Sequence, residues 1–210
     1  MSIESLTVKI LIICLACITI LYSAVTMVSC GNNGVNNHES TPVIMPLAIG
    51  NSWTSERLAT DSLGDTLWID TCTSRIASYS NIDSEIWFKL VSNCGKVGHK
   101  TNRKDGLWTK LDSIELNLTA KYPADVGYRW TNSDSSTEYI VVTTDTMIMV
   151  PTGTFKCYGY RWGDVSDSNS FGINYYSPDI GIVMNKYWPH GLSGNNEQTN
   201  RLIALNLNLN

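Results

Sequence analysis

Histidine, phenylalanine and charged residues are scarce in this chain of 210 residues. It contains three histidines and three phenylalanines, and charged residues make up 16% of it. None of the histidines (His38, His99 and His190) has an acid or a nucleophile at a local motif spacing. There is neither a GxSxG nucleophile elbow nor a DxDxDG calcium loop. The sequence therefore favours a protein that is not an enzyme. A hydrolase is kept as the less favoured alternative, because catalytic groups can converge from distant positions.

Patterns for binding metal or nucleic acid are also missing. The cysteines after Cys30 form no CxxC pair and no histidine stands at zinc-ligand spacing, so neither a metal nor another cofactor is predicted. The 15 basic residues are dispersed among 19 acidic ones, whereas nucleic-acid binding needs a basic stripe. The densest basic cluster, residues 96–104, precedes an Asp105-Gly106 turn signal and is predicted to be a solvated hairpin tip. Contact of this tip with an anionic lipid or glycan is the alternative.

The first thirty residues have the layout of a bacterial lipoprotein signal peptide. Lys9 is followed by an apolar run, residues 10–28, and a small residue then precedes Cys30. This layout predicts that residues 1–29 are removed and that acyl chains such as palmitate on the Cys30 thiol anchor the protein to a membrane. Gly31 is not the aspartate often linked with inner-membrane retention, which favours the outer membrane. A retained transmembrane anchor and ordinary signal cleavage are alternatives, because the apolar run is long enough to span a bilayer.

Period-two alternation of apolar residues dominates the rest of the chain. Residues 30–41 are mostly polar and are predicted to be a flexible tether, whereas residues 42–210 have the length of one domain. Residues 203–210 alternate strictly, as a half-buried strand does. Residues 137–150 and 155–162, separated by a Pro-Thr-Gly turn, are typical of a β-hairpin. The predicted fold is an antiparallel all-β domain of about nine to eleven strands, sandwich-like or barrel-like.

Three cysteines, Cys72, Cys94 and Cys157, follow the predicted anchor. An exported protein can form disulfides, and an odd count leaves one thiol over. If the chain reverses near Asp83, residues at equal distances from the turn face each other, as Cys72 and Cys94 do. A disulfide between them would close a loop of about 20 residues and contribute about 3 kcal/mol in the chain-entropy model. Two reduced, separately buried thiols are the alternative. Cys157 is predicted to be a lone core thiol.

One sequence pattern occurs twice. Residues 46–53 and 123–130 both read Pro-x-x-(Ile/Val)-Gly-x-x-Trp. Proline stiffens the entry, glycine permits a positive φ, and tryptophan would start a strand by filling the end of the core. We therefore predict that Trp53 and Trp130 are structural rather than ligand contacts. A duplicated half-domain is the alternative, but the segments after the two tryptophans do not align.

Aromatic residues are plentiful, with seven tryptophans and ten tyrosines. In the second strand of the predicted hairpin, Tyr158, Tyr160 and Trp162 would share one face, and Phe155 and Cys157 the other. If the second face is core, the first is an exposed aromatic row that forms a possible ligand face for sugars or a lipid. Burial of this row by an opposing sheet or a loop is the favoured reading, because aromatic rows in β-domains are usually core.

Three segments carry a resemblance to a known group of proteins. Residues 46–53, 150–158 and 175–183 resemble the PLxxGNxW, VPxGTFxCY and YYxPxxGxV segments that occur in this order in poorly characterised bacterial envelope lipoproteins. Met184-Asn185 follows the last segment, where the group commonly has a basic residue. The resemblance implies an exported β-rich domain, an open half-barrel similar to periplasmic lipoprotein carriers, and supplies no catalytic residues.

These observations predict a membrane-anchored envelope lipoprotein with a non-catalytic β domain for binding or assembly. Its partner would be a glycan, a lipid or an envelope protein. The alternatives are a carrier-like half-barrel for an apolar ligand and a hydrolase of envelope polymers. A concave apolar cavity would favour the carrier, and two carboxylates about 5–9 Å apart would favour the hydrolase.

Overall fold

All regular secondary structure that the structure describes is β-strand. The computed structural model describes residues 42–95, 97–111, 115–166, 170–189 and 197–208. The predicted signal peptide, the acylation at Cys30 and the tether lie outside these residues. The strands are β1 (Ser52–Thr60), β2 (Thr66–Ile82), β3 (Glu85–Ser92), β4 (Val97–Arg103), β5 (Gly106–Leu111), β6 (Glu115–Lys121), β7 (Arg129–Thr131), β8 (Thr137–Val150), β9 (Gly153–Asp164), β10 (Phe171–Ser177), β11 (Gly181–Trp188) and β12 (Glu197–Asn206). Within the same ranges, no helix has the length and apolarity to cross a membrane.

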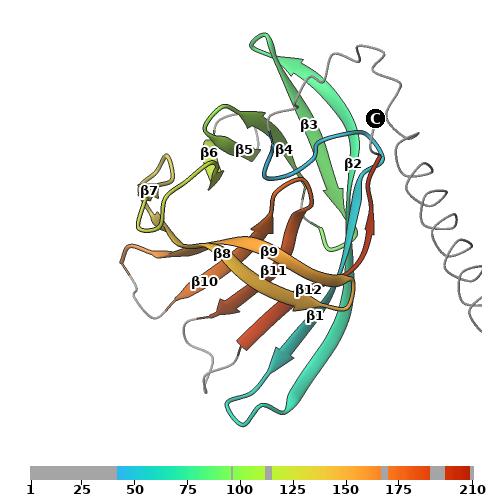
Figure 1. Cartoon of the computed structure of the whole chain (residues 1–210), viewed down its shortest axis with the longest axis vertical. Helices are drawn as coiled ribbons and strands as arrows, with labels where there is room; N and C mark the ends of the chain where they lie inside the picture. The colour runs from blue at the N-terminus through green and yellow to red at the C-terminus, as the bar shows by residue number, and fades with distance from the viewer. Residues whose placement is uncertain (1–41, 96, 112–114, 167–169, 190–196, 209–210) are drawn as a thin grey trace, which may run out of the picture. The chain divides into compact units, whose positions relative to one another are not determined.

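The strands form one antiparallel sheet in the order β6-β5-β4-β3-β2-β1-β12-β11-β10-β9-β8-β7. The first and last strands lie side by side in its middle, because β1 pairs with both β2 and β12. The sheet curves strongly but does not close, since β6 and β7 are its two edges (Figure 1). The prediction of an antiparallel all-β domain forming an open half-barrel is confirmed. The predicted strand number is too low, because the sheet has twelve strands.

β6 and β7, the two edge strands, are not paired through their backbones, but side-chain hydrogen bonds connect them. The Trp130 indole N–H donates to the Leu118 carbonyl of β6 at 2.8 Å. The Ser133 backbone N–H donates to the Asn117 Oδ1, also on β6, at 2.9 Å. The Trp130 ring also stacks on Tyr139, with ring centroids 5.1 Å apart. Trp130 therefore ties β7 to β6 through its side chain, which is a structural role.

The basic segment predicted to be a hairpin tip is mostly a strand. β4 ends at Arg103, and β5 begins at Gly106, so only Lys104 and Asp105 form the turn. The Arg103 guanidinium donates two hydrogen bonds to Glu85, at 2.8 and 2.7 Å. The prediction of a solvated tip is wrong because so short a turn leaves the rest of the cluster within the sheet. Alternation along β4 then directs Lys100 toward one face of the sheet.

A β-bulge in β12 changes the face that its residues present. Thr54 pairs with Ala204 and Ser55 with Leu202, so Ile203 is the extra residue. A one-residue insertion moves the residues beyond it to the opposite face. Leu202, at 2% exposure, is therefore the buried residue, and not Ile203 as strict alternation predicts.

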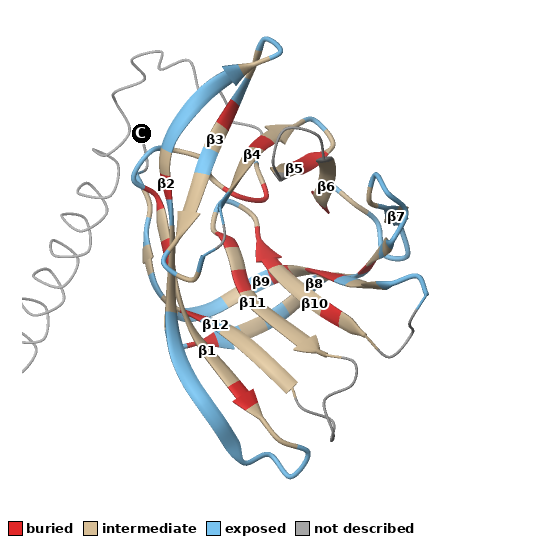
Figure 2. Ribbon diagram, turned by 180° about the vertical axis from the view of Figure 1, so that it is seen from behind, coloured by how far each residue is buried: buried red, intermediate tan, exposed pale blue. Residues whose placement is uncertain are grey.

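The segment before β1 fills one end of the inner face, which is the face that carries Trp53. Ile44 and Met45 are buried there, and the Met45 carbonyl accepts a hydrogen bond from Asn102 Nδ2 at 2.9 Å. The Trp53 indole N–H donates to the Ile180 carbonyl at 2.6 Å. Figure 2 shows the buried residues of the sheet in red. We call residues 43–50 the plug segment, because they place apolar side chains inside the curved sheet.

The β8–β9 hairpin crosses strands that are not its neighbours in the sheet. It passes in front of β11 and β12 in Figure 1, and the reverse view in Figure 2 places it behind them. At its turn, the Thr152 hydroxyl donates to the Leu202 carbonyl of β12 at 3.4 Å. Irregular register in β8, around Thr143, permits this bend. Cys157 is fully buried in this region as a free thiol, and burial raises its pKa to about 12.

Candidate ligand-binding cavity

The inner face of the sheet bounds a cavity of about 590 Å³. Its floor is formed by buried side chains next to the plug segment: Met45, Trp53, Tyr176, Val183 and Leu202. Its walls come from β1–β4 and β9–β12. Small-molecule sites typically have volumes of about 300–1,000 Å³, so this cavity has the size of a site for one small ligand.

A row of polar side chains crosses the cavity at right angles to the strands. Arg57 of β1 pairs with Asn200 of β12, which pairs with Asn185 of β11. Asn185 in turn pairs with Asn174 of β10. Asn200 Nδ2 donates to Asn185 Oδ1 at 3.2 Å, and Asn185 Nδ2 donates to Asn174 Oδ1 at 2.5 Å. We call Asn174, Asn185 and Asn200 the amide row.

The amide row has hydrogen-bonding capacity left for a ligand. Each side-chain amide has two N–H donors and a carbonyl oxygen with two lone pairs, and the contacts within the row use only some of these. Asparagine is also depleted in β-strands, because its side chain neither packs nor branches in the way a pleated surface favours. Three asparagines at one level of a sheet are therefore unusual for β-strands.

An aromatic pair lies beside the amide row. Trp162 of β9 and Tyr187 of β11 stack with ring centroids 5.3 Å apart and planes inclined by 12°. Gly172 of β10 pairs with both residues and lies between them. A Cβ at Gly172 would lie 2.6 Å from the Trp162 ring, so only glycine lets the indole extend across β10. The Trp162 indole nitrogen is buried and has no hydrogen-bond partner in the described part of the chain.

Lys100 reaches the cavity from β4. Its ammonium group donates to the Thr109 hydroxyl at 2.8 Å, and Thr109 is also hydrogen-bonded to Thr119. No Asp or Glu among the described residues lies within ion-pair distance of Lys100. Desolvation of the ammonium group lowers the pKa of Lys100 to about 8. Lys100 therefore holds a positive charge at neutral pH in surroundings that disfavour it.

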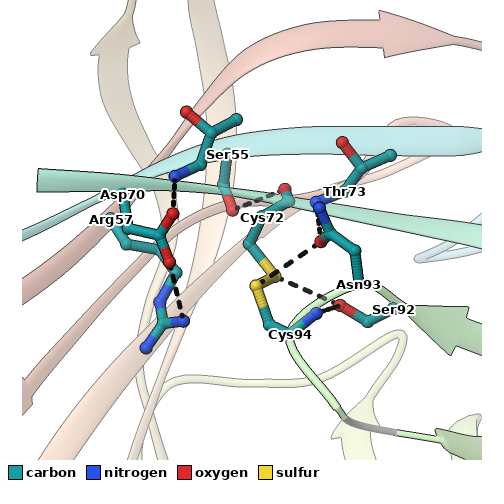
Figure 3. Close-up of polar contacts among 9 residues, drawn as sticks. Ser55, Arg57, Asp70, Cys72, Thr73, Ser92, Asn93 and Cys94 are labelled. Atoms are coloured by element: carbon teal, nitrogen blue, oxygen red, sulfur yellow. Dashed lines mark hydrogen bonds and ion pairs between the residues drawn. A yellow bond between two sulfur atoms is a disulfide. The ribbon is translucent and has the colours of Figure 1, made fainter.

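A disulfide joins Cys72 of β2 to Cys94, just after β3, and both residues line the cavity (Figure 3). Their Cα atoms are 5.8 Å apart. The chain reverses at Asp83 and Ser84, both with positive φ, and a register shift between Ile76 and Ser78 of β2 then moves the pairing by one residue, which brings the two cysteines opposite each other. The Ser92 hydroxyl accepts a hydrogen bond from the Cys94 backbone N–H at 3.2 Å.

The aromatic residues of β9 that sequence analysis proposed as a ligand face do not form an exposed row. Tyr160 is fully buried, and its hydroxyl donates to the Lys121 carbonyl at 2.7 Å. Tyr158 stacks on Tyr160 and meets Tyr122 edge to face. Only Trp162 lines the cavity. For Tyr160 this is the burial that the sequence analysis favours over an exposed row.

Of the three histidines, His99 is the one that the structure describes, and it does not line the cavity. It lies in β4 next to Lys100. His38 and His190 lie outside the described residues. Within those residues, no group of three or more His, Cys, Asp or Glu side chains could hold a metal ion.

Sequence reasoning missed the amide row, Lys100 and Arg57 as cavity residues. The asparagines come from three strands, and their alignment follows only from strand register. A signal is present in the hairpin β10–β11, where Asn174 and Asn185 stand among mostly aromatic and aliphatic residues.

The chain is similar in structure to two solved bacterial proteins. One is described as an exported protein with a YmcC-like fold from Bacteroides fragilis, at 13% identity and a TM-score of 0.42, covering 80% of this chain and 100% of that one. The other is described as a lipoprotein from Parabacteroides distasonis, at 12% identity and a TM-score of 0.41, covering 79% and 99%. Neither the protein-family models nor the curated proteins give a match.

Proposed function

We propose that this protein is an exported lipoprotein, anchored through Cys30, whose β domain binds a small polar ligand in the cavity without catalysing a reaction. The observation that carries the proposal is the amide row inside a cavity of about 590 Å³. The ligand would come from the cell envelope, as a free molecule or as part of a larger glycan or lipid.

The character of the cavity walls supports binding of a polar ligand rather than an acyl chain. Arg57, the amide row and Gln198 line the same space as Trp162 and Tyr187. Such a mixture of aromatic surface and a few convergent polar groups is typical of specific small-molecule sites. Most of the lining is apolar, which the carrier alternative also requires, so the polar ligand is favoured by the convergence of Arg57, Gln198 and the amide row and not by the lining as a whole. The hydrolase alternative needs paired carboxylates, and none occurs among the described residues that line the cavity.

The N-terminal sequence supports the anchor. A basic residue, an apolar run and a small residue before Cys30 form the pattern that lipoprotein processing recognises. Replacing Cys30 with alanine should leave an unprocessed precursor that takes up no labelled fatty acid. Maturation of this variant with continued fatty-acid labelling would overturn the anchor and with it the proposed localisation in the outer membrane.

Native mass spectrometry of the full-length protein purified from bacterial membranes tests the binding function. We expect the wild-type protein to retain a small molecule and Asn185→Leu to lose it, because the middle of the amide row is then removed. Asn81→Leu is the matched control, since Asn81 is an exposed residue of β2 far along the strand from the cavity residues Cys72 and Ser74. Equal retention by the wild type and Asn185→Leu would contradict a site at the amide row.

A further inference from the structure

The cavity is positively charged in a protein that is negatively charged. The whole chain has a formal net charge of -4. Among the described residues that line the cavity, Arg57 and Lys100 are charged, and no aspartate or glutamate is present. The carboxylate of Asp70 lies 3.6 Å from the Arg57 guanidinium, but Asp70 is exposed and is not part of the lining. The potential inside the cavity therefore attracts anions.

Among the described residues, no carboxylate forms an ion pair with Lys100. Its ammonium group donates to one hydroxyl, that of Thr109, and an ammonium has three N–H donors. A charged group held in partly dry surroundings without an ion-pair partner destabilises the fold. Such a residue is explained when the missing partner belongs to a ligand.

The neutral walls fit a ring that carries hydroxyl groups. The Trp162–Tyr187 pair presents aromatic surface, and the faces of sugar rings bind to such surface. The amide row offers several donors and acceptors at one level, which suits a set of neighbouring hydroxyls. An acyl chain would leave the remaining donors and acceptors of the amide row without partners.

We infer that the cavity binds an acidic sugar, with its carboxylate or phosphate near Lys100 and Arg57 and its ring and hydroxyls against the aromatic pair and the amide row. This inference rests on the proposed binding function and adds the charge and the class of the ligand. Free monosaccharide acids and acidic units of a longer glycan share this chemistry.

Isothermal titration of the purified full-length protein in detergent tests the inference. The probes are trisaccharides of galacturonate, glucuronate and mannuronate, a sugar phosphate (glucose 6-phosphate), the methyl esters of the three uronates, and dodecanoate as an apolar anion. Methyl esterification removes the charge and keeps the ring and hydroxyls. We expect at least one acidic sugar to bind, and any uronate that binds to exceed its ester by about tenfold or more, which corresponds to loss of one charge-assisted hydrogen bond.

Lys100→Met should weaken binding of the acidic sugar by about tenfold and leave any binding of its ester unchanged. Lys110→Met is the matched control, because Lys110 lies in the neighbouring strand β5 and is not among the residues that line the cavity. A melting curve of each variant shows that it is folded.

Each of the other outcomes overturns the inference, and each can be told apart from the others. Equal binding of acid and ester would show a neutral-sugar site and leave the proposed binding function standing. Tighter binding of dodecanoate than of every sugar would show a lipid site, again leaving a binding function. Binding of none of the acidic sugars would reject the acidic-sugar class, and retention of another molecule in the native mass spectrum would then still support binding. If the native mass spectrum also shows no retained molecule, both the acidic-sugar inference and the proposed binding function are rejected.

Discussion

The inner face of the sheet has two parts, and they differ in whether their buried polar groups have partners. At the plugged end, which is also the floor of the cavity, Ile44, Met45 and Trp53 are buried, and the indole N–H of Trp53 donates to the Ile180 carbonyl. In the cavity, Lys100 lacks an ion-pair partner among the described residues and the Trp162 N–H lacks an acceptor there. The same curved sheet carries both. Under the proposed function, the plugged end stabilises the fold, whereas the cavity keeps Lys100 for a ligand at a cost in stability.

Removing the tryptophan of the plugged end should have the largest effect. Trp53→Ala should lower the free energy of unfolding by about 3–5 kcal/mol, because truncating a buried tryptophan leaves a cavity and removes its packing. Thermal unfolding measures this. Trp68→Ala is the matched control, since Trp68 in the next strand is 38% exposed and should cost far less. Equal destabilisation by the two variants would contradict the assignment of stability to the plugged end.

Breaking the disulfide should have the next largest effect. Replacing both Cys72 and Cys94 with serine should lower the free energy of unfolding by about 3 kcal/mol, because the bridge restricts the unfolded chain. Chemical denaturation with and without a reducing agent measures it. Cys157→Ala is a control for loss of a cysteine outside the bridge, and its response to the reducing agent should equal that of the wild type. If the reducing agent does not shift wild-type unfolding, the bridge does not contribute to stability.

Disrupting the amide row should change stability less than the two preceding variants do, and should change ligand binding more. Asn185→Leu removes two side-chain hydrogen bonds, which together contribute about 1–2 kcal/mol to stability. It should also abolish retention of the ligand. The comparison between the plugged end and the cavity would fail if Asn185→Leu were as unstable as Trp53→Ala and still bound its ligand.

The sequence predicts the local structure well and the cavity hardly at all. The hairpin of residues 137–150 and 155–162 appears as β8 and β9, because alternation and a Pro-Thr-Gly turn are local signals. Cys72 and Cys94 lie opposite each other as predicted, but the register depends on a shift between Ile76 and Ser78 as well as on the turn, and nothing in the sequence indicates that shift.

The cavity depends on information that is not local. Arg57 and Asn200 become neighbours only because the first and last strands pair. The bulge at Ile203 then decides which residues of β12 face inward, and strict alternation in the sequence conceals it. The inward position of Lys100 was hidden by a basic cluster that resembles a solvated turn.

Thermal unfolding of Lys100→Met without ligand, measured from pH 7 to pH 10.5, tests the central claim most directly. Burial depresses the pKa of Lys100 from 10.5 to about 8, so its unfavourable contribution is fully present below pH 8 and fades as the pH rises to 10.5. The other charged residue among the described lining is Arg57, and burial raises the pKa of Tyr176 away from this range. The account predicts that the variant is more stable than the wild type at pH 7, by about 1 kcal/mol after allowance for partial exposure, with a gain that shrinks toward pH 10.5. A variant that is less stable than the wild type at pH 7 would show that Lys100 supports the fold, and would contradict the claim that the cavity is kept for a ligand.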